Sequence, residues 1–148
     1  MADRPIASSR QIAAPPEVVH DLLTSVEAWQ LWSPHVASVD PPHGRVEEGW
    51  RGRVRAWFAP VPTEMIVTLV VPDRGMEWET PWLGHTLRYS QRIEPTPAGS
   101  RVDFEARVEG PLAGVITAVA RPLSGLGQRR RLARLAALAE LMARPSDE

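Results

Sequence analysis

Hydrophobic and polar residues alternate through the middle of the chain, and this period of two restricts the fold more than any other feature. Between Val36 and Glu109 the alternation is interrupted at intervals of about ten residues by groups that contain proline and glycine. Such a pattern is typical of antiparallel strands joined by tight turns. It predicts a meander of six strands, near 36–40, 50–58, 64–71, 75–80, 85–94 and 100–109.

The predicted strands each have an apolar and a charged face. In the last one, positions Val102 to Val108 are apolar at every second residue, and the positions between them are charged. In the second predicted strand, 50–58, every second residue from Arg51 to Arg55 is an arginine, so Arg51, Arg53 and Arg55 share one face. We interpret the charged faces as solvated and paired across strands, in preference to an anion site.

A short strand and two helices are expected ahead of the meander. Ile6–Ile12 alternates weakly and ends at two prolines, of which Pro16 suits the first turn of a helix. Thr24 and Glu27 have the spacing of a capping box, which predicts that a second helix begins there and ends at Ser33-Pro34.

The C-terminal third has helical periodicity from Gly110-Pro111 to about Met142. Pro122 lies between two apolar stripes of this helix, and a proline removes a backbone donor and clashes with the preceding turn. Glycines follow closely and also disfavour helix. We therefore expect a kink or a break near 121–127, and a frayed tail over 144–148.

Composition excludes several kinds of chemistry. All 17 basic residues are arginine and cysteine is absent, so the chain has no thiol nucleophile and no lysine for a Schiff base or a phosphate loop. A net charge of −1 offers no field for nucleic acid. No apolar run reaches membrane-spanning length and no signal peptide is recognisable, so we expect one cytoplasmic domain over 1–148, without stable membrane insertion.

Several segments together resemble one family. Ser9–Val19, followed by Trp29 and Trp32-Ser33-Pro34, resembles the start of the START-like superfamily called SRPBCC, which includes polyketide cyclases, dehydrases and lipid-transfer domains. Gly49, the strand from His85 and the Gly110-Pro111-Leu112 junction also lie where that family has them. The resemblance covers nearly the whole chain.

The resemblance implies an α+β helix-grip fold. In that fold a curved seven-stranded antiparallel sheet wraps around a long C-terminal helix, and two short helices follow the first strand. A deep and largely apolar cavity lies between sheet and helix. The family therefore implies a small hydrophobic ligand, and we expect neither a cofactor nor a metal.

Carried onto this sequence, the cavity should be lined by the apolar strand face and by the last helix between Val115 and Leu126. The few polar side chains on the inner face are His85, Tyr89 and Gln91. The predicted ligand-binding residues are Trp32, Trp78, His85, Leu87, Tyr89, Gln91, Phe104, Val115 and Val119. The alternative is a core filled by its own side chains, in which His85 caps a strand end and Trp32 packs the helices onto the sheet.

Catalysis, if present, would involve Tyr89 and His85, because a phenol and an imidazole could position a carbonyl and move a proton. The helix-pair segment differs from that of aromatase-type cyclases, so no catalytic residue is carried over from them.

Two other constellations favour ordinary structural roles. The spacing of His35, Asp40 and His43 fits no defined metal-ligand pattern. Four arginines of the last helix are interpreted as its solvated side rather than as a grip on phosphate or on an anionic membrane: Arg129, Arg130, Arg131 and Arg134.

Three functions remain open at this point. The leading one is a carrier or sensor that binds a hydrophobic metabolite such as a lipid or a polyketide-like molecule. The second is a cyclase or dehydrase that acts on such a molecule. The third is a protein-interaction module whose cavity is filled. Ligand identity and oligomeric state stay undetermined.

Overall fold

The computed structural model describes residues 5–144, so the predicted frayed tail lies almost entirely outside the described residues. Eleven elements follow one another along the chain: β1 (Ile6–Ile12), α1 (Pro16–Thr24), the 3-10 helix η1 (Val26–Ala28), α2 (Trp29–Trp32), β2 (Val36–Asp40), β3 (Arg51–Ala56), β4 (Thr63–Val71), β5 (Gly75–Trp82), β6 (His85–Thr96), β7 (Gly99–Glu109) and α3 (Ala113–Ala143).

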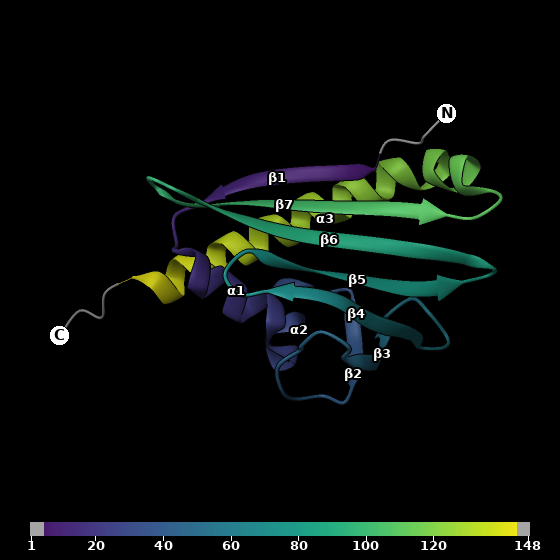
Figure 1. Ribbon diagram of the computed structural model, residues 1–148, viewed down its shortest axis with the longest axis horizontal. Helices are drawn as coiled ribbons and strands as arrows, with labels where there is room; N and C mark the ends of the chain where they lie inside the picture. Colours follow the sequence, from purple (N-terminus) through teal and green to yellow (C-terminus); the bar gives the residue numbers. More distant parts are fainter. Residues whose placement is uncertain (1–4, 145–148) are drawn as a thin grey trace.

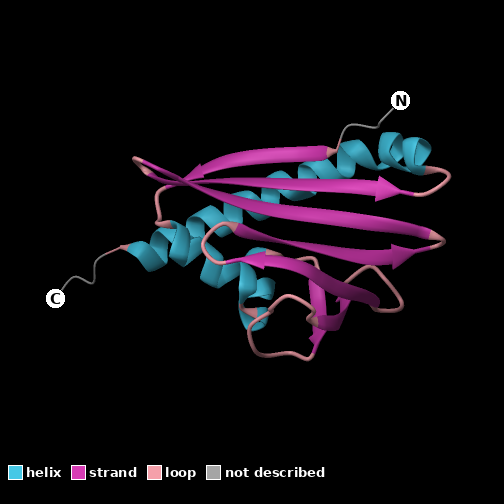
Figure 2. Cartoon of the chain, in the orientation of Figure 1, coloured by secondary structure: helices cyan, strands magenta, loops and turns pink. Residues whose placement is uncertain are grey.

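The strands form one antiparallel sheet in the order β1-β7-β6-β5-β4-β3-β2. All six strands of the predicted meander are present within a few residues of their expected bounds, and β1 pairs with β7 from Ile6↔Ala106 to Ile12↔Ser100. Helix α3 runs along one face of the sheet, and β2 and β3 lie steeply across the direction of the longer strands (Figures 1 and 2). The α+β helix-grip prediction is confirmed.

The predicted capping box is wrong. Thr24 is the last residue of α1, and its hydroxyl donates to the carbonyl of His20 (2.8 Å) instead of capping a new helix. Glu27 accepts a hydrogen bond from the backbone N–H of Gly44 at 3.0 Å. A 3-10 turn and the four-residue α2 therefore replace the expected second helix, and Glu27 anchors the β2–β3 connection.

Helix α3 continues through Pro122 for 31 residues, so a break does not occur. Its two halves are buried unequally, since its fully covered residues lie from Gly125 onward apart from Thr117. Leu132, Leu135 and Ala139 pack with α1, α2 and the sheet in the apolar core. No helix of residues 5–144 is long and apolar enough to cross a membrane.

Candidate functional site

A cavity of about 80 Å³ lies where α2, the sheet and the second half of α3 meet. Its walls are mostly apolar, with a few polar side chains among them. The lining residues are Leu23, Trp29, Trp32, Ser33, His35, Val36, Val54, Met65, Met76, Trp78, Gln91 and Arg131.

Trp29 and Trp32, both on α2, form one wall of the cavity. The Nε1–H of Trp29 donates to the carbonyl of Leu23 at 2.8 Å, and that of Trp32 donates to the carbonyl of Leu22 at 3.0 Å. Because these hydrogen bonds satisfy both indole N–H groups, the rings offer only apolar surface to the cavity. Trp32 also packs against Phe104, and the centroids of the two rings lie 6.0 Å apart.

Arg131 brings a charge to this wall. Its Nε–H donates to the carbonyl of Gly127 at 3.2 Å, and none of the ion pairs found within residues 5–144 involves its guanidinium. Burial lowers the pKa of Arg131 below its ordinary value, and the nearby Tyr89 opposes that shift. A cation with reduced access to water is normally stabilised by an anion. No carboxylate of the described residues forms an ion pair with Arg131, so its charge has no counter-charge there.

His35 faces the same cavity from the segment between α2 and β2. Its Nδ1 lies 3.2 Å from the Ser33 hydroxyl. Burial, reinforced by the charge of Arg131, lowers the pKa of His35 from 6.5 to about 4. The imidazole is therefore neutral at physiological pH, and Arg131 is the single cation of the lining.

Tyr89 and Trp78 lie side by side on β6 and β5. Their rings stack with centroids 4.0 Å apart and an interplanar angle of 15°. Burial raises the pKa of the Tyr89 phenol, whereas Arg131 acts in the opposite direction. The phenol is thus protonated at neutral pH and can donate a hydrogen bond beside the guanidinium.

His85 is occupied by the backbone and does not line the cavity. The N–H of Leu112 donates to its Nε2 at 3.1 Å, which leaves the ring proton on Nδ1, 3.0 Å from the carbonyl of Leu83. The ring therefore joins the β5–β6 turn to the start of α3. A Cβ at Gly110 would lie 2.3 Å from this ring, so glycine is required there.

The structure brings only part of the predicted set together. Trp32, Trp78 and Gln91 line the cavity. Tyr89 stacks on Trp78 but is not among the lining residues, and both of them line the larger depression described below. Phe104 is buried behind Trp32, and Leu87 is half-buried on the same sheet face, paired with Thr80. These two contribute to packing around the site.

Val115 and Val119 do not line the cavity. Their side chains are 63% and 75% exposed. At 100° per residue Val119 lies opposite Thr117, the buried residue of this half of α3. The helix therefore faces the sheet with its small and polar residues here, and the apolar stripe from Val115 to Leu123 points outward.

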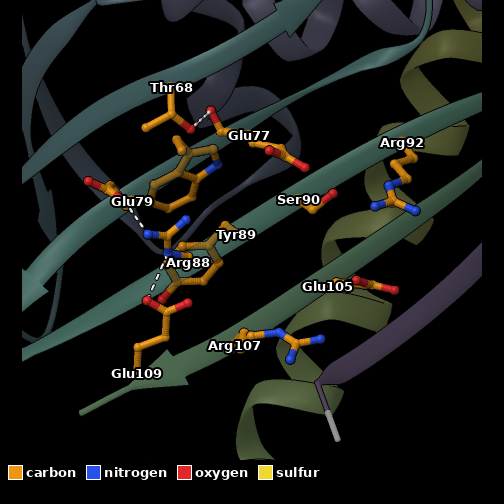
Figure 3. A pocket seen from close by; sticks show the side chains of 11 residues that line it. Thr68, Glu77, Glu79, Arg88, Tyr89, Ser90, Arg92, Glu105, Arg107 and Glu109 are labelled. Atoms are coloured by element: carbon orange, nitrogen blue, oxygen red, sulfur yellow. Dashed lines mark hydrogen bonds and ion pairs between the residues drawn. The ribbon is translucent and has the colours of Figure 1, made fainter.

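A larger depression of about 380 Å³ lies on the charged face of β5, β6 and β7. Figure 3 shows its long side chains extending from neighbouring strands. Arg88 bridges two carboxylates there, at 3.0 Å from Glu109 and 3.7 Å from Glu79. Acidic and basic side chains compensate one another across this surface, which is the arrangement expected of a solvated sheet face.

Two lining residues were assigned structural roles from the sequence. His35 was interpreted as part of a loop, and Arg131 as part of the solvated side of α3. Arg131 stands four positions before the buried Leu135, a spacing that places both on one helix face. The exposed Arg129 has an equivalent spacing to the buried Leu132, three positions on, so spacing alone did not separate the two arginines.

Among the described residues, no three His, Asp or Glu side chains gather in a way that could hold a metal. His35 lies in the cavity wall, whereas Asp40 and His43 are exposed at and beyond the end of β2.

Similar folds occur among solved structures. A crystal structure from Mesorhizobium loti matches with a TM-score of 0.75 and 18% identity over 93% of this chain and 98% of that one. A Bacillus halodurans solution structure matches at 0.72 and 17%, over 95% and 100% of the two chains. DynU16, from the dynemicin biosynthetic locus, matches at 0.72 and 14%, over 95% of this chain and 49% of its own.

These likenesses define the protein as a helix-grip protein. No curated protein sequence matches the chain. The family model described as polyketide cyclase / dehydrase and lipid transport matches residues 5–140. The chain therefore belongs to this family, of the SRPBCC type, as the sequence resemblance predicted.

Proposed function

We propose that the protein binds a small, mainly hydrophobic molecule in the cavity between α2, the sheet and α3, and acts as a carrier or sensor of that molecule. One observation carries the proposal: a mostly apolar cavity is lined by a few polar side chains, His35, Gln91 and Arg131 among them. That combination is typical of small-molecule sites. Membership of a family described by polyketide and lipid chemistry supports it.

The size of the cavity limits the ligand. Its volume of about 80 Å³ is well below the roughly 300–1,000 Å³ of drug-sized sites. The form described here therefore suits a short molecule, or the end of a longer one whose remainder extends outside.

The test is to extract freshly purified protein with organic solvent and to analyse the extract by mass spectrometry. We expect a stoichiometric apolar compound from the wild type and none from Val54→Phe, which places a larger side chain in the cavity wall. Val71→Phe, on an exposed position of β4, is the matched control and should retain the compound. Absence of any compound, together with failure of both hexan-1-ol and hexanoate to bind, would reject the proposal.

Catalysis by a cyclase or dehydrase mechanism is the second candidate. A protonated Tyr89 beside Arg131 favours it, because a phenol and a cation could together polarise a carbonyl oxygen. Both nitrogens of His85 are held by the backbone, so His85 is a poor proton carrier. The test is to incubate any extracted ligand with the wild type and with Tyr89→Phe. Equal turnover by the two proteins would rule out this role for Tyr89.

A further inference from the structure

The polar groups around the cavity share one property, the lack of a protein partner. The Gln91 side chain is only 8% exposed, yet its amide makes no hydrogen bond within residues 5–144. The terminal nitrogens of Arg131, the Tyr89 hydroxyl and the Nε2 of His35 likewise have none in this part of the chain. Within residues 5–144, the enclosed side-chain atoms without a partner are the Nδ1 of His20 and the Oγ of Ser90, so the atoms of this cluster are open to the cavity or to solvent. They are therefore donors and acceptors that a molecule bound in the cavity can pair with.

The positive charge of Arg131 indicates that the missing partner is an anion. Arg131 is the only cation that lines the cavity, and the carboxylates of the described residues pair with other arginines or lie elsewhere. An anion placed against the guanidinium would supply the missing counter-charge, and Gln91 and Tyr89 could donate further hydrogen bonds.

We propose that the ligand carries a carboxylate and that this carboxylate pairs with Arg131 inside the cavity, while the apolar body of the ligand lies against Trp32 and Trp78. This assignment rests on the proposed binding function and specifies its ligand class.

A monoanion fits better than a phosphate monoester. His35 is neutral at physiological pH because its pKa is about 4, so the lining holds one positive charge. A carboxylate balances that charge, whereas a dianion would leave a negative charge in an apolar cavity. A planar carboxylate also matches the two parallel donors of a guanidinium.

The test compares two probes of equal chain length, hexanoate and hexan-1-ol, by NMR titration of the full chain. We expect the wild type to bind hexanoate at least tenfold more tightly than hexan-1-ol. Arg131→Gln should lose at least tenfold in affinity for hexanoate and keep its affinity for hexan-1-ol within about twofold. Arg130→Gln is the matched control, since Arg130 is adjacent and exposed, and it should behave as the wild type.

A second readout separates charge pairing from packing. Because Arg131 lowers the pKa of His35, that pKa should rise when hexanoate binds, and also in Arg131→Gln. Arg131→Met, which keeps an unbranched side chain, replaces Arg131→Gln if the latter does not fold.

The outcomes distinguish the two proposals. Equal binding of hexanoate and hexan-1-ol by the wild type, or equal weakening of both in Arg131→Gln, overturns the carboxylate assignment and leaves the binding function standing. Failure of both probes, with no extracted compound, rejects the binding function and the assignment together.

Discussion

His35 couples the stability of the protein to pH. The folded protein resists protonation of this ring down to about pH 4, whereas the unfolded chain binds the proton near pH 6.5. Stability therefore falls as the pH drops from 6.5 to about 4, because only the unfolded state gains a proton in that window. The shift corresponds to up to about 3 kcal/mol, and the partial exposure of the ring reduces this to about 1–2 kcal/mol.

We predict that His35→Gln loses about 1–2 kcal/mol less stability than the wild type between pH 7 and pH 4. Urea denaturation at several pH values measures the difference. His43→Gln, on an exposed loop position, should follow the wild type. If the free energy of unfolding fell equally with pH in His35→Gln and in the wild type, His35 would not be the group responsible.

Gly110 allows the ring of His85 to approach the backbone at the start of α3. Its φ of +143° and the 2.3 Å approach of an added Cβ to that ring both oppose any larger residue. We predict that Gly110→Ala destabilises the protein by about 2–4 kcal/mol in chemical denaturation.

The control for this prediction is Gly84→Ala. Gly84 has a positive φ of +77°, but nothing lies within 4 Å of an added Cβ. Its cost should therefore be only about 1 kcal/mol, the conformational part alone. If the two variants lost the same stability, the contact with His85 would be irrelevant.

Among the elements, the strands could be predicted from the sequence, whereas the contribution of α3 to the cavity lining could not. Alternation and turn residues are local signals, so β2 to β7 could be placed from the sequence. The helix pair was misassigned because Thr24 and Glu27 have capping-box spacing but bond to His20 and to Gly44, the latter through the tertiary fold. The role of Arg131 depended on which face of α3 meets the sheet, which composition alone does not reveal.

Pro122 lies within α3, at an exposed position where the helix packs against little. A proline costs about 3 kcal/mol in a helix interior, partly offset by about 0.4–1 kcal/mol because it restricts the unfolded chain. We predict that Pro122→Ala stabilises the protein by about 2–2.6 kcal/mol in thermal and urea denaturation. Pro111→Ala, which precedes α3, should change stability by less than about 0.5 kcal/mol. A destabilised Pro122→Ala would mean that the proline sets the course of the helix.

In the molecule as a whole, ligand binding should stabilise the fold, because the cavity is lined by α1, α2, five strands and α3. A ligand present at 100 times its dissociation constant adds about 2.7 kcal/mol. For a chain of this size that corresponds to a rise in Tm of about 5–10 °C.

We predict this rise for saturating hexanoate with the wild type and a much smaller one with Arg131→Gln, as measured by calorimetry. An unchanged Tm at saturation would contradict preferential binding of hexanoate to the folded protein.

The attachment of β1 also determines when the molecule can be completed during synthesis. Residues 6–12 leave the ribosome before the other strands, whereas β7 and α3, which contact β1 on two sides, are made after the rest of the sheet. The Gln128 side chain closes this junction, since it donates to the carbonyl of Ile6 at 2.7 Å and accepts from the Ser8 hydroxyl at 2.9 Å. The meander can therefore begin to pair while translation continues, whereas the cavity is closed only after α3 has left the ribosome.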